Sequence, residues 1–254
     1  MSFLPFDLVD ILPFAAAGFA AQLIDGALGM AFGVISSTLL VSLGVAPAAA
    51  SAGVHFVEVF TTGVSGVSHI LQRNVDWKLL ARLAIPGVIG GVLGAYVLSN
   101  IDGAVARPFV LAYLSIMGAY LVWRSFNFPP RHSAPTIVEP LGLAGGFLDA
   151  AGGGGWGPVV TSNLLAQGSE PRRTIGTVNS TEFILTIVIS ATFIGALGWA
   201  AFTKATVGLL IGGVAAAPLG AIVARRTTPK VLLRLVGILL VVTSLFGIWQ
   251  ALTR

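Results

Sequence analysis

Residues 18–33 read GFAAQLIDGALGMAFG, and residues 142–157 read GLAGGFLDAAGGGGWG. A shift of 124 positions aligns the two stretches without a gap and places Asp25 on Asp149. The same shift continues downstream and aligns three further pairs, which are Gly33 with Gly157, Pro47 with Pro171 and Glu58 with Glu182. A chain of two similar halves, each opening with an apolar stretch that glycine interrupts, is typical of secondary transporters.

The composition indicates a protein of the lipid bilayer. Hydrophobic residues make up 56% of the 254 positions and charged residues only 9%, whereas a soluble domain is about 25% charged. A water-soluble fold could not cover its surface with so few charges, so we expect an integral membrane protein. The absence of cysteine excludes disulfides and thiolate metal sites, and we expect no cofactor. The basic residues lie in short loops, which favours a role in membrane topology over nucleic-acid binding.

The two halves fill nearly the whole chain and define its organisation. We expect a first transmembrane repeat at 11–124, a cytoplasmic linker at 125–139 and a second transmembrane repeat at 140–252. Each repeat contains five apolar segments, predicted as helices at 11–24, 28–43, 48–71, 79–98 and 104–123, and at 140–149, 155–167, 174–197, 205–224 and 231–252. The last three segments of each repeat are about 20 residues long, which is enough to span about 30 Å of hydrocarbon.

The first two segments of each repeat are shorter and are separated by glycine. The breaks are predicted at Asp25-Gly26 and at Gly152 to Gly155, where four consecutive glycines cannot form a stable helix interior. Irregular backbone at membrane depth persists only where it is buried in protein or lines an aqueous cavity. Each first pair is therefore predicted to form a broken or re-entrant hairpin with its tip inside the membrane.

Lysine and arginine predict the orientation, because they collect in cytoplasmic loops. The loop after the third segment is rich in basic residues in the first half, whereas the matching loop of the second half has only Lys204. The two repeats should therefore be inserted in opposite directions. With the central linker inside, all lysines and arginines are cytoplasmic except Arg107, Lys204 and Arg254, and both termini lie outside the cytoplasm. The predicted fold class is an all-α polytopic protein of the inner (plasma) membrane with two inverted repeats.

The helix after each break should begin with free N–H groups and the positive end of a helix dipole, which favour an anion. The tip residues expected to contact a solute are Gly26, Gly29, Gly33, Gly152, Gly153, Gly154, Gly155 and Trp156. Asp25 and Asp149 lie at the tips with two roles open. They could cap N–H groups two or three residues further on, or belong to a polar pocket that binds protons. Later glycines, at positions 87, 91, 94, 208, 212 and 220, are assigned to helix packing.

The third segment of each half carries the strongest polar signal. Polar residues recur at intervals of three or four along one helix face, at positions 55, 58, 62, 65 and 69 in the first half and 179, 182, 186 and 190 in the second. An ionisable group in a membrane span costs about 2.5 kcal/mol or more and by default marks a functional site. We expect Asn179, Thr181 and Glu182 to complete the solute pocket with His55 and Glu58. Protonation of a glutamate would admit an anion that the ionised form repels; the alternative is a structural hydrogen bond.

Short polar side chains also follow each tip. Asn163 is a candidate contact for the solute. The hydroxyls beside it, Thr161 and Ser162, and those at the matching positions of the first half, Ser36, Ser37 and Thr38, are expected to bond the backbone of their own or a neighbouring helix.

The tips resemble the sulfite exporter TauE/SafE family, also called the toluene-sulfonate uptake permease family. The resemblance rests on the duplicated cores LIDGALGMAFG and FLDAAGGGGWG, each followed by a proline and by a polar third helix that contains glutamate. It covers nearly the whole chain. It implies transport of a small sulfur-containing anion, such as sulfite, sulfoacetate, another sulfonate or a related organic acid, driven by an ion gradient.

Two other functions stay open at this point. His55, Glu58 and Asp25 could bind a divalent metal cation for transport, and Glu58 with His55 could act as acid and base in an intramembrane enzyme. Motifs of soluble enzymes, such as a P-loop, HExxH or CxxC, do not occur in a plausible context, so we expect a transporter and not an enzyme. The expected partners are a small anionic solute and the lipid bilayer, with a homodimer as one option for assembly.

Overall fold

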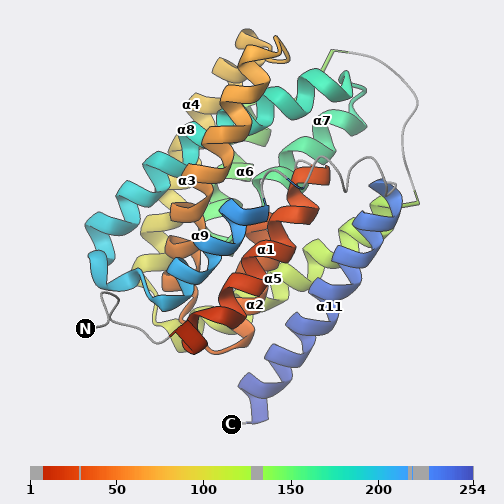
Figure 1. Ribbon diagram of the computed structural model, residues 1–254. Helices are drawn as coiled ribbons and strands as arrows, with labels where there is room; N and C mark the ends of the chain where they lie inside the picture. Colours follow the sequence, from red (N-terminus) through yellow and green to blue (C-terminus); the bar gives the residue numbers. More distant parts are fainter. Residues whose placement is uncertain (1–7, 29, 127–133, 217–218, 220–228, 254) are drawn as a thin grey trace.

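The computed structural model describes residues 8–28, 30–126, 134–216, 219 and 229–253, in which every regular element is helical (Figure 1). The first half contains α1 (Leu8–Leu28), α2 (Phe32–Ser42), α3 (Pro47–Leu71), α4 (Trp77–Asn100) and α5 (Gly103–Arg124). The second half contains α6 (Glu139–Gly152), the π-helix η1 (Trp156–Thr161), α7 (Ser162–Ala166), α8 (Pro171–Leu197), the 3₁₀ turn η2 (Trp199–Ala201), α9 (Lys204–Ala216) and α11 (Pro229–Thr253). The predicted all-α class is confirmed.

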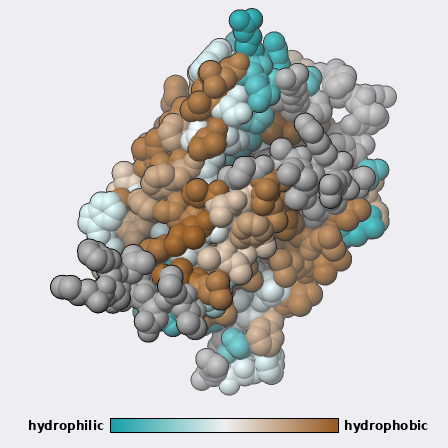
Figure 2. Space-filling model, in the orientation of Figure 1, coloured by the Kyte–Doolittle hydropathy of each residue, from teal (hydrophilic) through white to brown (hydrophobic). Residues whose placement is uncertain are grey.

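The surface of the helices is suited to lipid. Among the described residues, four stretches are long and apolar enough to cross a membrane, namely α4, α5, Arg173–Leu197 of α8 and Leu233–Gln250 of α11. Figure 2 shows apolar residues over most of the visible face, with hydrophilic residues gathered toward its upper end. Large apolar side chains stand far out of the protein; Val64 and Ile85 are each 68% exposed and Phe109 is 72% exposed. An apolar surface of this extent requires a bilayer, so the chain is a multi-pass membrane protein.

Two predicted boundaries in the hairpins were wrong. α1 continues to Leu28, and the described residues outside a helix are 30 and 31, so the first break does not lie at Asp25-Gly26. A single glycine costs only about 1 kcal/mol inside a helix, and the packing of α1 along α9 outweighs that cost. The segment predicted as one helix at 155–167 is instead the π-helix η1 followed by the short α7.

Helices of the two halves pack in a reciprocal pattern. α1 lies along α9 and α6 lies along α4, while α3 packs on α8 and α5 on α11 (Figure 1). If each helix is replaced by its counterpart in the other half, the α1–α9 pair becomes the α6–α4 pair. The α3–α8 and α5–α11 pairs are unchanged by this exchange. Every extensive helix contact in the described residues therefore joins one half to the other, so the halves form one unit rather than two separate domains.

Glycines make these crossings close, as predicted. A Cβ atom on Gly90 of α4 would overlap the Leu143 carbonyl oxygen of α6, and one on Gly212 of α9 would overlap the Ala15 carbonyl oxygen of α1. Positions 87, 91, 94 and 208 likewise face side chains or backbone of a neighbouring helix, which confirms their packing role. Gly220 lies outside the described residues, as does most of the predicted segment beyond Ala216.

Replacing Gly90 by alanine should destabilise the protein, because the added methyl group must push α6 away from α4. We expect the midpoint of thermal unfolding in detergent to fall by about 5 °C, as overpacking a tight contact costs about 1–3 kcal/mol. The matched control is Gly195→Ala in α8, where a Cβ atom would meet nothing within 4 Å. That control should be neutral or slightly stabilising, since alanine favours helix. Equal midpoints for both variants would contradict this packing.

The end of each hairpin has the same local structure in both halves. Gly44, with φ of 96°, ends α2, and its N–H and that of Val45 donate to carbonyls of the last turn. Gly168, with φ of 97°, ends α7 in the same way, together with Ser169. Left-handed glycine is the usual terminator of a helix. A proline three residues after each glycine then begins the polar third helix, so the repeat is visible in the backbone as well as in the sequence.

Polar contacts hold the two ends of the bundle. At one end, the Lys204 ammonium pairs with Asp10 at 2.9 Å, joining the beginnings of α9 and α1. At the other end, Arg82 of α4 forms two hydrogen bonds to Glu139 at the start of α6, of 2.5 and 3.0 Å. The hydrogen bond and charge of Arg82 lower the pKa of Glu139 to about 2, so this carboxylate stays ionised near neutral pH.

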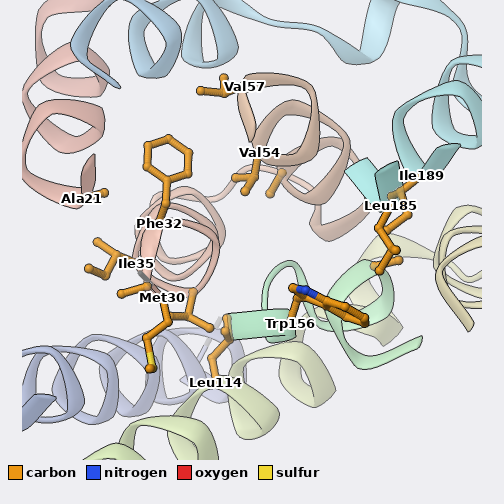
Figure 3. Packing of buried hydrophobic residues seen from close by; sticks show 14 of the residues in the cluster. Ala21, Met30, Phe32, Ile35, Val54, Val57, Leu114, Trp156, Leu185 and Ile189 are labelled. Carbon is orange, nitrogen blue, oxygen red and sulfur yellow. The ribbon is translucent and has the colours of Figure 1, made fainter. Parts of the chain in front are cut away.

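Helix α2 lies at the centre of the packing. Phe32 and Ile35 are each 2% exposed and lie between Ala21 of α1 and Val54 of α3 (Figure 3). Trp156 is fully buried at the start of η1 on the opposite side of the core. The helices that begin directly after the two breaks, α2 and η1, are therefore largely buried in protein, which is the condition for irregular backbone inside a membrane.

Candidate solute site at two helix breaks

Each helix break is bridged by the aspartate that precedes it. The Phe32 N–H donates to Asp25 Oδ1 at 3.1 Å, and the Trp156 N–H donates to Asp149 Oδ1 at 2.9 Å. The two pairs coincide under the shift of 124 positions, and each joins residues seven apart. The expected capping is confirmed, but it reaches across the break and not two or three residues along the chain. Because each carboxylate already accepts this N–H, the first amide of each second helix is not free for an anion, contrary to the prediction.

The backbone just before each second helix is also the same in the two halves. Ala31 has φ of 152° and ψ of −12°, and Gly155 has φ of 163° and ψ of −16°. In the second tip, Gly153 and Gly154 have φ of 75° and 134°, which glycine adopts with little cost. Alanine at the first tip stores strain on the order of 1–3 kcal/mol. The two tips are therefore built alike, and the duplicated sequence specifies duplicated geometry.

The two tips lie against each other. A Cβ atom on Gly154 would overlap the Gly33 carbonyl carbon and would lie 2.5 Å from the Val34 nitrogen. A Cβ atom on Gly33 would lie 3.0 Å from Gly154 Cα and 2.9 Å from Glu58 Oε1. Glycine at both positions lets the backbones of the two halves touch beside a buried carboxyl group. This contact confirms that the two breaks meet, as the repeat predicted.

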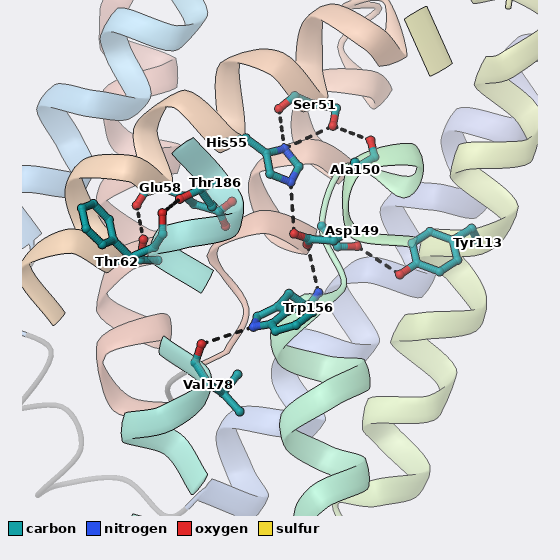
Figure 4. Close-up of polar contacts among 12 residues, drawn as sticks. Ser51, His55, Glu58, Thr62, Tyr113, Asp149, Ala150, Trp156, Val178 and Thr186 are labelled. Carbon is teal, nitrogen blue, oxygen red and sulfur yellow. Dashed lines mark hydrogen bonds and ion pairs between the residues drawn. The ribbon is translucent and has the colours of Figure 1, made fainter. Parts of the chain in front are cut away.

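His55 of α3 holds the second tip (Figure 4). Its Nδ1 lies 2.8 Å from the Ser51 carbonyl oxygen and its Nε2 lies 3.1 Å from Asp149 Oδ2. A carbonyl oxygen can only accept, so the contact with Ser51 assigns a proton to Nδ1. The bond to Asp149 then requires one further proton, on either Nε2 or the carboxyl group. The pair is neutral in both cases, and Ser51 Oγ adds a bond of 2.7 Å to the Ala150 carbonyl of the same tip.

Four carboxyl groups converge near this contact. Glu58 interacts electrostatically with Glu182, Asp149 and Asp25, and Glu58 and Glu182 are 3% and 9% exposed. Of these four, only Asp149 takes part in an ion pair within the described residues. Asn179 stands at the position of His55 in the second half, so Asp25 has no equivalent basic partner from that position. Asp25, Glu58 and Glu182 are therefore the carboxyl groups of this set that have no ion pair within the described residues.

Glu58 is held through its backbone and not through its carboxyl group. The Thr62 hydroxyl donates to the Glu58 carbonyl at 2.5 Å, whereas Glu58 Oε2 has no hydrogen-bond partner among the described residues. Buried polar atoms are rarely left without partners, and such an atom at a helix break invites a functional explanation. The structural hydrogen bond considered as the alternative role is thus not observed at this oxygen.

Several predicted site residues lie elsewhere or are already engaged. Asn163 is exposed and donates to the Val159 carbonyl of its own helix at 2.7 Å, so the structure does not bring it to the tips. The Trp156 ring packs against α4 and α6, and its Nε1 donates to the Val178 carbonyl. The Thr181 hydroxyl donates to the Thr177 carbonyl, while Asn179 is 3% exposed on the same helix. Gly26 lies in the last turn of α1, and Gly29 is outside the described residues.

Tyr113 of α5 is a tip residue that sequence reasoning missed. Its hydroxyl donates to the Gly154 carbonyl at 3.1 Å, and its ring occupies the space where side chains on Gly152 and Gly155 would lie. Nothing in the α5 sequence marks Tyr113 as functional, because the repeat puts no polar group at its counterpart. The other side of Tyr113 lines an apolar groove of about 300 Å³ between α4, α5 and α6. This groove is separate from the carboxyl groups, so we do not assign it to an anionic solute.

Loss of the Asp149 carboxyl group should loosen the second tip. In Asp149→Ala, the Trp156 N–H and His55 Nε2 lose their partner, and we expect the unfolding midpoint to fall by about 5 °C or more. Asp149→Asn should stay within about 2 °C of the wild type, because its amide can accept from Trp156 and donate to His55. Thermal unfolding in detergent measures both variants. Equal losses would show that the charge, and not the hydrogen bonds, holds the tip.

Duplicated helix breaks that meet around buried carboxyl groups, inside a helical protein with a lipid-facing surface, define a membrane transport protein. The chain belongs to the sulfite exporter TauE/SafE family, whose model matches residues 14–247. It is 43% identical over 255 residues to the probable membrane transporter protein YtnM of Bacillus subtilis (strain 168), covering 96% of this chain and 85% of that protein. No solved structure matches the chain. The family and this relative support a transporter and not an enzyme.

Proposed function

We propose that this protein is a secondary transporter of a small anion, with sulfite, an organosulfonate or a related organic acid as the expected solute, coupled to protons. The observation that supports it most is the contact of Gly33 with Gly154 beside the Glu58 carboxyl group, whose Oε2 has no hydrogen-bond partner among the described residues. Glycine tips allow backbone to approach a solute closely, and the two helices that begin there direct their positive dipole ends into the protein. The family contributes the expectation of a sulfur-containing anion.

Protons provide the coupling in this proposal. An anion beside an ionised glutamate is repelled by about 4 kcal/mol at a separation of about 4 Å and an effective dielectric constant of about 20. That energy corresponds to about a thousandfold in affinity. Binding of a proton to Glu58 or Glu182 removes the repulsion, and the bound anion in turn favours the proton by the same factor. Proton and anion would therefore bind together and be released together.

The arrangement of the helices supports opposite insertion of the two halves. Successive contacts show α1 running parallel to α9, and α4 running parallel to α6. The first pair begins at the end with Lys204 and Asp10, and the second pair begins at the opposite end with Arg82 and Glu139 (Figure 1). We infer that the end with Arg82 is cytoplasmic and that both termini are outside, in agreement with the distribution of basic residues.

The divalent-cation alternative receives no support from the geometry. Among the described residues, no three His, Asp or Glu side chains form a group that could hold a metal ion. His55 directs one nitrogen to a carbonyl oxygen and the other to Asp149, so neither ring nitrogen offers a free lone pair for coordination in this arrangement. Proton-coupled anion transport would use the same carboxyl groups as proton-binding sites. It would not require them to coordinate a single metal ion together.

Proteoliposomes test the proposal. With an acidic exterior, we expect sulfite or methanesulfonate to accumulate above its external concentration, and a protonophore should abolish the accumulation. Chemical analysis of the transported solute should find it unchanged, which separates transport from an enzymatic reaction. Uptake that does not depend on the pH gradient would refute proton coupling. Uptake of nickel or cobalt without uptake of any anion would favour the cation alternative.

A further inference from the structure

Two buried hydroxyl groups at matching positions of the repeats lack hydrogen-bond partners. Ser37 and Thr161 coincide under the shift of 124 positions, and both are 0% exposed. Neither Ser37 Oγ nor Thr161 Oγ1 has a partner among the described residues. The sequence prediction that they would bond the backbone was therefore wrong for these two residues, and most buried polar groups in proteins do find partners.

Some neighbouring hydroxyls follow the ordinary rule, although Ser36 of α2, against the same prediction, and Ser190 of α8 also lack partners among the described residues. Thr38, the next residue along α2, donates to the Val34 carbonyl at 2.6 Å. In α8, Ser180 and Thr181 donate to the carbonyls four residues before them, at 2.8 and 2.7 Å. A hydroxyl in these helices can thus donate a hydrogen bond to a backbone carbonyl of its own helix. What distinguishes Ser37 and Thr161 is that they occupy matching positions of the repeat, whereas Ser36 matches Val160 and Ser190 matches Gly66.

Ser37 lies beside the tip of the other half, and Thr161 lies in the helix that follows the second tip. Ser37 lies one turn after Gly33, and its Oγ is 2.7 Å from the point that a Cβ atom on Gly153 would occupy. Thr161 ends η1, and the next residue, Ser162, directs its Oγ toward Met30 Sδ of the first tip at 3.8 Å. Ser37 is therefore next to the tip of the other half, and Thr161 directly precedes Ser162, which reaches the first tip.

We infer that Ser37 and Thr161 donate hydrogen bonds to two oxygens of the transported anion, one from each half. The inference rests on the proposed function and adds the residues that select the solute. A hydroxyl is a neutral donor, so it can bind an oxyanion without adding positive charge beside Glu58 and Glu182. Two donors from opposite sides favour a solute with at least two oxygens on one centre, as in sulfite, a sulfonate or a carboxylate, over a halide.

Equilibrium binding to purified protein tests the inference, with sulfite, methanesulfonate, acetate and chloride as probes. We expect Ser37→Ala and Thr161→Val each to raise the Kd of the best oxyanion by about tenfold, as for loss of a hydrogen bond to a charged group. Without the anion, neither variant should be less stable than the wild type, because each loses only an unpaired hydroxyl. Thr38→Val is the control, and its Kd should be unchanged. Thr161→Ser keeps the hydroxyl and should retain affinity within about threefold.

The outcomes are distinct. If the wild type binds an oxyanion and both variants bind it equally well, the hydroxyls are not ligands and the inference fails while the proposed function stands. The inference also fails if the substitutions change only the dependence of anion binding on sodium, because the hydroxyls would then bind a cation. If the wild type binds none of the oxyanions, the proposed function itself fails. A loss of affinity in Ser37→Ala and Thr161→Val, with affinity kept in Thr161→Ser, establishes the role even if one variant is less stable.

Discussion

Gly154→Ala should abolish transport. The residue has φ of 134°, which alanine adopts only with strain on the order of 1–3 kcal/mol. The new methyl group would also overlap the Gly33 carbonyl carbon of the other half and crowd the Val34 nitrogen. Backbone on both sides of the contact cannot move without displacing both tips. We expect the initial rate of anion uptake in proteoliposomes to fall by about a hundredfold or more, as positioning errors of about 1 Å can produce such losses.

The control for this variant is again Gly195→Ala, which adds the same methyl group to a helix where nothing lies within 4 Å. It should transport at the wild-type rate. A comparison of folding, by thermal unfolding and gel filtration, separates a closed site from an unfolded protein. Gly154→Ala with a normal rate would mean that the two tips need not touch during transport, and the proposed site would then be wrong.

Glu182→Gln should abolish concentration of solute by a pH gradient while leaving solute binding intact. Glutamine has the shape of protonated glutamate and carries no charge, so the anion should bind at least as well as to the wild type. The variant cannot exchange a proton, and the gradient then has no means of driving the solute. We expect exchange of labelled for unlabelled anion to continue, and accumulation above the external concentration to be absent. Glu58→Gln should likewise exchange the anion without accumulating it if both carboxyl groups carry the coupling proton.

Glu139→Gln is the matched control for these glutamate variants. Glu139 is exposed at the start of α6 and stays ionised near neutral pH, because Arg82 holds its pKa at about 2. Its loss removes one surface ion pair, and solvent-exposed ion pairs contribute little to stability. Coupled accumulation should therefore persist. If Glu182→Gln still concentrates the anion against its gradient, Glu182 does not carry the coupling proton.

Features that depend on residue type and register were predictable from the sequence. The shift of 124 positions located both breaks to within a few residues and paired the two aspartates, while the packing glycines were recognised from their GxxxG-type spacing. These predictions succeed because glycine and proline act on the backbone nearest to them. The polar face of α3 was likewise readable from its spacing, and His55 and Glu58 are buried on that helix.

Features that depend on long-range packing were not predictable. The bond from Asp25 to Phe32 depends on the path of the residues between them, which several glycines leave undetermined by local preference. Tyr113 reaches the second tip because α5 passes beside it, and no local pattern encodes that approach. Ser37 lacks a partner although Thr38 beside it has one, and the choice is set by the opposite tip. The pairing of α1 with α9 likewise depends on long-range packing and was not predictable from the sequence.

A crystal structure with a bound anion containing selenium or bromine gives the most direct test, because anomalous scattering locates that atom independently of the model of the protein. Selenite and a brominated sulfonate are suitable probes. The account predicts a single strong peak between the two tips, in contact with residues 30–33 and 152–156 and near Ser37 and Thr161. A peak only in the apolar groove beside Tyr113 or at the surface, in protein that transports the same anion, would contradict it.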